Sequence, residues 1–415
     1  MGWAKRKMEE DEEKGFASGN NSLICSKHFE DYALQRFIIS NGKVGRCEYC
    51  DIEELEDDRG VPVVTFDALM DVIVEGITNH YGNPDDEGVG YDSREGGYML
   101  DEIYDTYDLI RDVIMLEADD DSIVQEIIDT IGMKAWCPYN PYTLAESAEL
   151  RYDWETFCKL IKHEVRFVFF RYPKKLEKDY QTLEPSYILD KIGEFIVGLG
   201  MFFKTNPPHL LVKFPLTMFR ARQHSKTEEI TNCDGIGPPP TEKATNANRF
   251  SPAGISMFYG SRRKSTAIQE IIDPTKTDEL ITIGSFKNAR PLNLIDLTSL
   301  KEISIFDLSK SKYYQPALFL MGFIESISKK IEKDGREHFE YVPTQVVTEY
   351  LRHVLPEVSG NNVDGIKYKS ALDGEDCYVI FANQNLCRDE GNEGKETILT
   401  LEKGSLDTIA VSNVK

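Results

Sequence analysis

Between residues 61 and about 203, apolar residues recur at intervals of three and four, which is the spacing of an amphipathic α-helix. The clearest segments are VTFDALMDVIVEGITNHY, EIYDTYDLIRDVIMLEA, DSIVQEIIDTIG and TFCKLIKHEVRFVFF. Breaks rich in Gly, Pro and Asp, such as GNPDDEG, separate them. We therefore predict a mainly α-helical domain over residues 52–204.

The pattern changes at residues 204–209, where the sequence KTNPPH contains two prolines that would break a helix. Beyond it, β-branched and aromatic residues form short runs: LLVKFPLTMFRA, ISMFYG, ELITIGSF, LNLIDL, GIKYKS and CYVIFA. Helical spacing returns between these runs at residues 266–272, 316–331 and 345–354. This alternation predicts an α+β domain over residues 205–390, followed by a C-terminal tail over 391–415.

The first 50 residues show little of either pattern. Residues 1–22 carry charge runs and then Gly-Asn-Asn-Ser, so we expect a frayed, flexible leader with little to bury. After it come two pairs of metal-ligating side chains, Cys25 with His28 and Cys47 with Cys50, each pair separated by two residues. This spacing is typical of a closed tetrahedral zinc site, in which the metal holds the fold and performs no chemistry. We therefore predict a zinc-ribbon-like module over residues 23–51.

Composition and charge narrow the classes of function. The chain has 415 residues, a length that favours two or three domains. Its net charge of −23 argues against nonspecific nucleic-acid binding, which depends on clusters of Lys and Arg. Eight cysteines in a chain of this length are typical of reduced thiols. Because no apolar run is long enough to cross a bilayer or to act as a signal peptide, we expect a cytoplasmic protein that does not enter membranes.

Residues 246–272 carry the most suggestive group of polar side chains. The segment Pro252-Ala253-Gly254 predicts a turn, and a strand and a helix are predicted after it. Arg249 precedes the turn, Tyr259 ends the strand and Glu270 lies on the helix. Each of these residues alone has an ordinary structural explanation. Together they place a guanidinium, an aromatic ring and a carboxylate around one compact scaffold.

Elsewhere in the α+β half, Arg220 and Arg222 end the first strand and Ser370 ends the strand GIKYKS. Arginines form paired hydrogen bonds with a pyrophosphate, and an aromatic face attracts a cationic ring. A carboxylate stabilises positive charge at an anomeric carbon, as in the cleavage of glycosidic bonds. The residue types therefore suit a dinucleotide with a positively charged ring.

At this point the sequence resembles the RES domain family, which is named for its Arg, Glu and Ser. The matching words, in the family's order, are FRAR at 219–222, GPPP at 237–240, NRFSPAGISMFYGS at 248–261, TAIQE at 266–270, YVPTQVVTEYLR at 341–352 and DGIKYKS at 364–370. The first half, with its Cys and His set and its helical run, resembles the HEPN/RES N-terminal domain of longer members. One departure is Ser251, where short members commonly have Asn.

The resemblance implies a fold related to ADP-ribosyltransferases and a toxin that consumes NAD+. It makes Arg220, Glu270 and Ser370 the catalytic Arg, Glu and Ser, with Arg249 and Tyr259 as further NAD+-binding residues. Arg222 lies two positions after Arg220, so both side chains would point to the same face of the strand. Which of the two is the main pocket arginine stays open. Gln345 and Glu349 lie in another matched word, YVPTQVVTEYLR, and are candidate site residues outside the immediate pocket.

Three readings of the function stay open. The first is breakdown of NAD+, with release of nicotinamide and with water or phosphate as the acceptor. The second is transfer of ADP-ribose to a protein side chain from the same pocket. The third is a non-catalytic zinc and helical binding module. Short RES toxins work beside an antitoxin; for this chain, an antitoxin or regulatory partner and a homo-oligomer both stay open.

Overall fold

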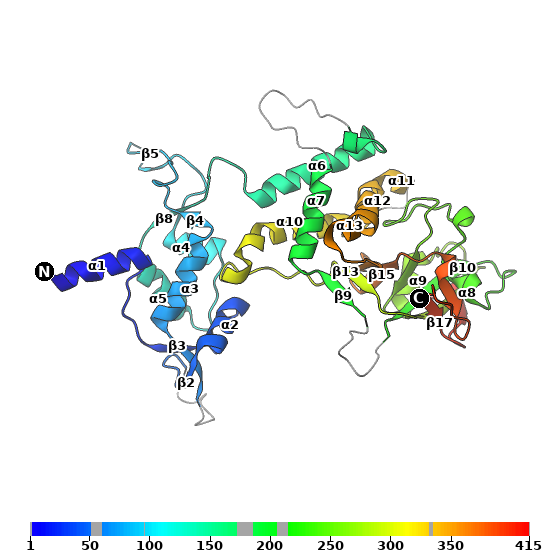
Figure 1. The fold of residues 1–415 in the computed structure, drawn as a ribbon, viewed down its shortest axis with the longest axis horizontal. Coiled ribbons are helices and arrows are strands. Elements are labelled where there is room, and N and C mark those ends of the chain that lie inside the picture. The colour runs from blue at the N-terminus through cyan, green and yellow to red at the C-terminus, as the bar shows by residue number, and fades with distance from the viewer. Residues whose placement is uncertain are drawn as a thin grey trace. The chain divides into compact units, whose positions relative to one another are not determined.

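The computed structural model describes residues 2–50, 60–94, 96–171, 186–205, 215–331 and 335–414 (Figure 1). Contacts divide the chain into two compact units. Unit 1 comprises Met1–Glu149 and Glu302–Ala317, and unit 2 comprises Leu150–Lys301 and Leu318–Lys415. Pro207 and Pro208, which suggested a domain boundary, lie outside the described residues, as does the start of the strand predicted next to them.

Unit 1 combines helices with small antiparallel sheets. Asp31, Thr65 and Asp120 cap its main helices by accepting hydrogen bonds from backbone amides of the first turn. In chain order its main elements are α1 Gly2–Lys14, β1 Leu23–Cys25, α2 Tyr32–Asn41, β2 Lys43–Gly45, β3 Val61–Thr65, α3 Phe66–Thr78, β4 Tyr81–Gly82, β5 Tyr91–Asp92, β6 Gly97–Tyr98, β7 Tyr104–Asp105, α4 Thr106–Asp108, α5 Asp121–Ile131, β8 Ala135–Pro138 and the start of α6 Glu146–His163.

The first residues of the chain differ from the frayed leader that we expected. Residues 2–14 form α1, and Phe16 is only 1% exposed within the hydrophobic core of unit 1. Beyond the helix, the Ser18 hydroxyl and amide both donate to the carboxylate of Asp11. The buried Phe16 ring and backbone hydrogen bonds, from Ala17 N to Thr130 O and from Gly19 N and Asn20 N to the Asp67 carboxylate, hold this segment, although its composition gives little sign of burial.

A segment that is distant in sequence completes unit 1. Residues 302–317 follow the β-rich part of the chain, yet Ile305 and Phe306 are buried in the same core as α3. A Cβ atom at Gly76 of α3 would lie 2.9 Å from the Phe306 ring, so glycine allows this close approach. Removal of the first 149 residues would therefore leave two large apolar side chains without their packing partners.

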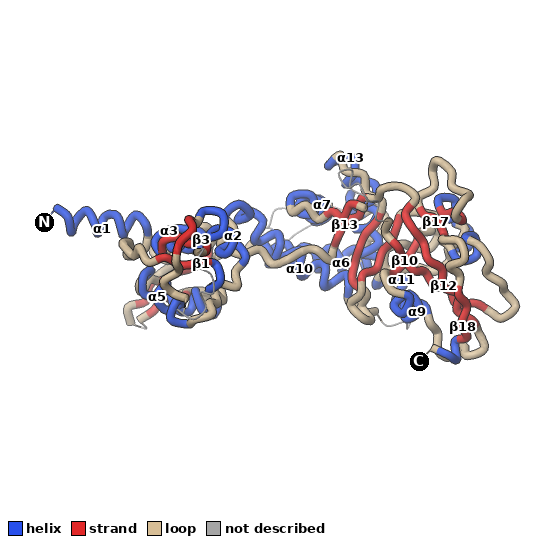
Figure 2. The backbone as a smooth tube through the Cα atoms, turned by 90° about the horizontal axis from the view of Figure 1, so that it is seen from below, coloured by secondary structure: helices blue, strands red, loops and turns tan. Residues whose placement is uncertain are grey.

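Unit 2 is built on a ten-stranded mixed sheet in the order β16-β17-β12-β10-β11-β15-β14-β13-β9, with β18 also paired to β12 (Figure 2). Helices and a mixed sheet agree with the α+β pattern predicted for this half. Its elements are most of α6, α7 Tyr187–Gly198, β9 Phe202–Lys204, β10 Thr217–His224, α8 Cys233–Ile236, β11 Phe258–Ser261, α9 Lys264–Ile271, β12 Leu280–Asn288, β13 Asn293–Asp296, all but the start of α10 Tyr314–Ser328, α11 Glu337–Glu340, α12 Val342–Glu349, α13 Leu355–Ser359, β14 Gly365–Lys369, β15 Asp376–Ile380, β16 Cys387–Asp389, β17 Leu399–Leu401 and β18 Asp407–Ala410.

Both ends of unit 2 extend beyond the α+β domain predicted from sequence. Residues 391–415, which we expected to be a tail, contribute β17 and β18, and both pair with β12. At the other end, α7 packs in unit 2 and β9 pairs with β13, although the prediction assigned residues up to 204 to the helical domain. Short strands are hard to recognise in sequence because their pairing partners lie far away in the chain.

The two faces of the sheet carry different cores. On one face, Tyr259, Ile366, Tyr368 and Val379 belong to a cluster with α6, α7, α10 and α12. Farther along this face, α9 packs on Phe219 and Ala221 of β10. On the other face, Met218, Phe258 and Ile380 pack around α8. Because side chains alternate between faces along a strand, this division fixes the direction in which each candidate residue points.

Candidate functional site

Glu270 and Ser370, which lie far apart in sequence, contact each other in unit 2. Glu270 is exposed near the end of α9, and Ser370 is 4% exposed just after β14. The Ser370 hydroxyl donates to Glu270 Oε1 at 2.5 Å. One helical turn earlier, the Thr266 hydroxyl donates to Asp373 at 2.6 Å. These hydrogen bonds fix one side of α9 to the turn between β14 and β15.

The turn after β14 determines the role of the Ser370 hydroxyl. Its backbone is closed by hydrogen bonds from Ser370 N to Glu375 O and from Gly374 N to Ser370 O. Gly374 has a φ of 71°, a conformation that glycine adopts without steric cost. The amide of Leu372 donates to Ser370 Oγ at 3.2 Å, while the hydroxyl proton points to Glu270. The turn therefore orients the serine toward the carboxylate.

Tyr259 lies in β11 on the face that packs against the helices. Its hydroxyl is 2.9 Å from Ser251 Oγ, and burial raises its pKa, so the phenol stays protonated at neutral pH. Tyr368 of β14 belongs to the same face and packs on Phe250 with ring centroids 4.7 Å apart. Burial, with the nearby Cys377 and Glu270 as further causes, raises the pKa of Tyr368. Both tyrosine rings are therefore neutral, and Tyr368 lies near Glu270.

Arg220 occupies a split in the sheet. The recorded pairing of β10 with β11 is limited to Phe219 and Ser261, whereas β10 pairs with β12 along its full length. Arg220 Nη1 donates to the carbonyl of Tyr259 at 3.0 Å, and Nε donates to Ile236 O at 2.8 Å. Burial lowers the pKa of Arg220 to about 10, which leaves the guanidinium charged at neutral pH. The side chain bridges β11 and α8 where the strands separate.

Arg220 and Arg222 share one face of β10, as their spacing predicts, but they have different surroundings. Arg222 donates to Gly235 O at 2.7 Å and forms an ion pair with Glu228, also at 2.7 Å. Both partners in that ion pair are partly exposed. Arg220 therefore reaches the strand that carries Tyr259, whereas Arg222 bonds to α8 and to a surface carboxylate. Both arginines leave β10 on the α8 face, opposite the face on which α9 carries Glu270.

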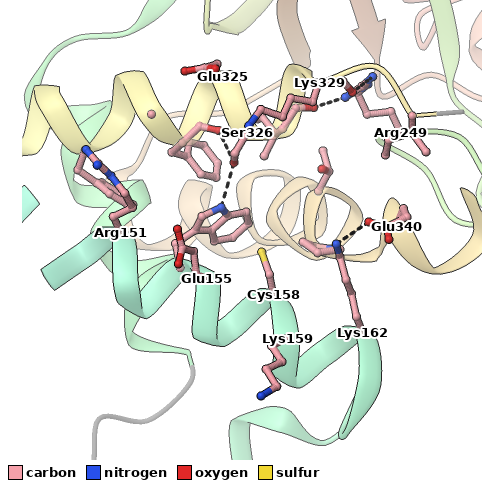
Figure 3. Close-up of a pocket in the computed structure, with 18 of the residues that line it drawn as sticks. Arg151, Glu155, Cys158, Lys159, Lys162, Arg249, Glu325, Ser326, Lys329 and Glu340 are labelled. Atoms are coloured by element: carbon pink, nitrogen blue, oxygen red, sulfur yellow. Dashed lines mark hydrogen bonds and ion pairs between the residues drawn. The ribbon is translucent and has the colours of Figure 1, made fainter. Parts of the chain in front are cut away.

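Arg249 points toward the end of α10 (Figure 3). Its guanidinium donates to the carbonyls of Ile327 and Lys329, the latter at 2.8 Å, and lies over the ring of Tyr341 at 5.6 Å. Burial raises the pKa of Tyr341; the charge of Arg249 acts to lower this pKa, and the charge of Glu270 acts to raise it. Of the residues predicted from sequence, the structure joins Glu270 to Ser370 directly and Arg220 to the backbone of Tyr259, and it places Arg249 against α10.

Sequence reasoning missed Asn248, Tyr341 and Tyr368 in this region and named Gln345 only as a candidate outside the immediate pocket. Asn248 and Ser251 form reciprocal backbone hydrogen bonds around Arg249. Gln345, only 6% exposed, donates to Asn248 O at 2.8 Å and thereby holds that turn in place. Tyr341 and Tyr368 both lie in sequence words that carry the family resemblance. Their position in these words was the only sequence signal that could have marked them as site residues. Ser251, the departure from the family pattern, is the hydroxyl partner of Tyr259.

In unit 1, the predicted metal ligands come together. The ligand atoms of Cys25, His28, Cys47 and Cys50 all lie within 4.8 Å of one another. Individual separations are 3.6 Å between the Cys25 and Cys50 sulfurs and 3.2 and 3.4 Å from His28 Nε2 to the Cys47 and Cys50 sulfurs. Tetrahedral zinc with bonds of about 2.0–2.3 Å places its ligand atoms roughly 3.5–3.8 Å apart. The donor set and its spacing therefore fit a closed zinc site.

Asp119 supports the histidine of this cluster from a different part of unit 1. Its carboxylate lies 2.8 Å from His28 Nδ1, so that Nε2 is left to face the sulfurs. The Asp119 amide also donates to His28 O at 3.0 Å. Carboxylates in this position fix the tautomer and ring orientation of metal-binding histidines. No sequence signal identified Asp119, because it lies in a run of acidic residues resembling an ordinary solvated turn.

Comparison with known families matches two domains. The HEPN/RES N-terminal domain 1 matches residues 40–175, and the RES domain matches residues 217–400. The chain therefore carries a HEPN/RES N-terminal domain followed by a RES domain. A RES domain implies, in general, an enzyme that acts on NAD+. Comparisons with curated proteins and with solved structures gave no match.

The two matched ranges do not test the domain limits predicted from sequence, which stay predictions. The N-terminal match begins after His28, so it includes only the second pair of metal ligands.

None of the helices in the described part of the chain combines the length and apolar character that a membrane crossing requires.

Proposed function

We propose that the chain is an NAD+-degrading enzyme of the RES toxin type that acts in the cytoplasm and depletes cellular NAD+. In this proposal the RES domain has an ADP-ribosyltransferase-like fold and cleaves the bond between nicotinamide and ribose. The contact between Ser370 and Glu270 carries the proposal, because it joins two residues of the family's Arg, Glu and Ser set.

The proposed reaction transfers one group. The bond between ribose C1′ and the pyridinium nitrogen breaks, and its electron pair stays with nicotinamide, which leaves as a neutral molecule. A water oxygen, or a phosphate oxygen, forms the new bond to C1′, and a water acceptor loses a proton to solvent. Positive charge develops at C1′ in the transition state, as in glycoside cleavage. A carboxylate held nearby stabilises that charge.

Glu270 is the side chain best suited to that role. It is exposed, so a substrate can reach it, and its Oε1 is oriented by the Ser370 hydroxyl while Oε2 has no recorded partner among the described residues. The free oxygen can accept a hydrogen bond from a ribose hydroxyl. The neutral rings of Tyr259 and Tyr368 provide aromatic surfaces for nicotinamide on the same side of the sheet.

Arg220 and Arg249 are proposed to bind the pyrophosphate and ribose of NAD+. The Arg220 side chain leaves β10 on the face opposite α9, so in this proposal it reaches the ligand through the split between β10 and β11, where it contacts Tyr259 O. Each guanidinium has five N–H donors. The recorded hydrogen bonds use two of the donors on each side chain, to backbone carbonyls, which leaves further donors for a ligand. Arg222 is the less favoured pocket arginine, since Glu228 already neutralises it.

The zinc proposal is separate from this chemistry. Cys25, His28, Cys47 and Cys50 would hold a structural Zn²⁺ ion. With four protein ligands the ion has no open position for substrate, so it would stabilise unit 1 and take no part in catalysis.

The decisive test is to incubate the purified chain with NAD+ and identify the products. Free nicotinamide with ADP-ribose, or with ADP-ribose 1″-phosphate when phosphate is present, is the expected result. Glu270→Gln should abolish turnover, while Glu357→Gln, which changes an exposed carboxylate on α13, should retain it. Labelled NAD+ that left ADP-ribose covalently bound to protein would favour a mono-ADP-ribosyltransferase instead. Intact NAD+ with folded protein would favour a non-catalytic binding module.

A further inference from the structure

The helix α9 contacts the turn between β14 and β15 through two side chains, Thr266 and Glu270. They are four positions apart, so they lie on the same side of the helix. The Thr266 hydroxyl donates to Asp373 Oδ2 at 2.6 Å, and Glu270 Oε1 accepts from the Ser370 hydroxyl at 2.5 Å. One of these bonds includes the carboxylate proposed to act on NAD+. The other lies one helical turn away from it.

Thr266 is placed to act inside the protein. Its side chain is 0% exposed, whereas Glu270 and Asp373 are both exposed. A substrate therefore cannot reach the Thr266 hydroxyl without rearrangement of the helix. Buried hydroxyls are almost always hydrogen-bonded, and Asp373 is the recorded acceptor of this one.

Asp373 belongs to the same turn as Ser370. The turn is closed by a hydrogen bond from Ser370 N to Glu375 O, and Glu375 N donates to Asp373 Oδ1 at 3.1 Å. Burial alone would raise the pKa of Asp373, but hydrogen bonds from Thr266 and from Glu375 N lower it below its ordinary value. The carboxylate is therefore charged at neutral pH, and a hydrogen bond to a charged acceptor is a strong one. A bond to Asp373 holds α9 to the turn that carries Ser370.

The remaining contacts of α9 constrain its position less. Its apolar side packs on β10, and hydrophobic contact has no preferred direction. At the start of the helix, Arg263 pairs with Glu375 at 2.9 Å, but the arginine is largely exposed, and surface ion pairs contribute little. A hydrogen bond has a narrow range of lengths and angles. The bond of Thr266 is therefore the contact that sets how far Glu270 lies from Ser370.

We propose that Thr266 and Asp373 are positioning residues of the NAD+-cleaving site, and that their hydrogen bond holds α9 where Glu270 meets Ser370. The inference rests on the function proposed above and adds two residues that act through Glu270. Small displacements of a reacting group cost large factors in rate. Loss of the bond should therefore slow cleavage and leave substrate binding nearly unchanged.

The kinetic test compares threonine variants of the full chain. Thr266→Val removes the hydroxyl and keeps the side-chain volume, so kcat for NAD+ cleavage should fall about tenfold or more while KM stays within about twofold. Thr266→Ser keeps the donor and should restore kcat to within about threefold of the unmodified chain. The matched control is Thr275→Val, because the exposed Thr275 hydroxyl makes the same kind of bond, at 2.6 Å, to Asp273 within its own loop. This control should keep the kcat of the unmodified chain.

A double-variant cycle tests whether the two residues act through one bond. Asp373→Ala should lower kcat by a factor similar to that of Thr266→Val. The double variant should be no slower than the slower single variant, because both changes remove the same bond. Thermal unfolding shows which variants are folded. Since Asp373 is exposed, its variant keeps the inference testable if Thr266→Val does not fold.

Hydrogen exchange provides a readout that does not depend on turnover. The amides of α9 should exchange about fivefold or more faster in Thr266→Val and Asp373→Ala than in the unmodified chain, and Thr275→Val should leave them unchanged. Unchanged exchange in the first two variants would overturn the inference.

The kinetic outcomes separate this inference from the proposed function. If the unmodified chain left NAD+ intact, the proposed function would fail and the positioning role with it. If the unmodified chain cleaved NAD+ and folded Thr266→Val had the same kcat, only the positioning role would fail. Losses that multiply in the double variant, or a raised KM with unchanged kcat, would also overturn it.

Discussion

The hydroxyl of Ser370 donates to the carboxylate of Glu270 at 2.5 Å, across a separation of 100 residues in the chain. The bond orients one carboxylate oxygen of Glu270, and within the described part of the chain the other oxygen has no recorded partner. A substrate that develops positive charge would meet a carboxylate of fixed orientation, and this preorganisation is the main way in which enzymes stabilise such charge.

Ser370→Ala should lower kcat for NAD+ cleavage roughly 10- to 100-fold, since a hydrogen bond to a charged group contributes about 1.5–3 kcal/mol. KM should change less, because the lost bond orients Glu270 and does not hold the substrate. Steady-state kinetics with a nicotinamide assay would measure both parameters. The matched control is Ser265→Ala, at an exposed serine of the same helix, which should behave like the unmodified chain. Equal rates for the Ser370 and Ser265 variants would remove Ser370 from the mechanism.

Replacing each arginine of β10 by lysine should distinguish Arg220 from Arg222. Arg220→Lys cannot keep both of its bonds, to Ile236 and Tyr259, so it should lower stability by about 1–3 kcal/mol and reduce turnover. Arg222→Lys keeps the positive charge beside Glu228 and should cost less than about 1 kcal/mol. Urea unfolding and NAD+ kinetics for the two variants provide the comparison. A larger loss of turnover for Arg222→Lys would make Arg222 the pocket arginine.

Metal content should depend on Asp119 as well as on the four ligands. The purified chain is expected to contain one zinc ion, and Cys47→Ala should lose it together with the folded structure around β1 and β3. Asp119→Asn should weaken zinc affinity about 10- to 100-fold while the ligand set stays intact. Competition with a coloured chelator measures this affinity, with Glu117→Gln as the control at a nearby exposed carboxylate. An unchanged affinity in the Asp119 variant would show that the carboxylate does not support the metal.

Asp307 should make the stability of unit 1 depend on pH. Burial alone would raise the pKa of Asp307, but hydrogen bonds from Ser309, Arg36 and Tyr32 outweigh it and lower the pKa below 3.8. The pKa is therefore lower in the folded state than in the unfolded state. This stabilisation is fully present above the unfolded pKa and is lost as the pH falls through the folded pKa.

Asp307→Asn should accordingly destabilise the chain at pH 7 by about 1–3 kcal/mol and reduce the loss of stability between pH 5 and the acid range. Thermal unfolding at a series of pH values tests this expectation. Asp101→Asn, at an exposed position, is the control and should show the pH dependence of the unmodified chain. If the Asp307 variant also kept that full dependence, the carboxylate would not be its source.

The sequence by itself determined much of the local structure, because periodicity is a property of neighbouring residues. The helix spacing at 316–331 became α10, and the runs ELITIGSF and GIKYKS became β12 and β14. The pairs Cys25 with His28 and Cys47 with Cys50 were also recognisable, because the ligands of a structural zinc ion recur at short, fixed intervals in the sequence. Glu270 and Ser370 were proposed as one site only through the order of the family words.

Only the tertiary structure decided how these pieces meet. Strand pairing brought Ser370 to Glu270, placed Arg220 in the split between β10 and β11, and drew residues 399–410 into the sheet. Asp119 and the segment with Ile305 and Phe306 gained their roles from partners far away in the chain. Such contacts depend on burial and on hydrogen bonds between distant residues, and a periodic pattern contains no information about which distant partner each residue will find.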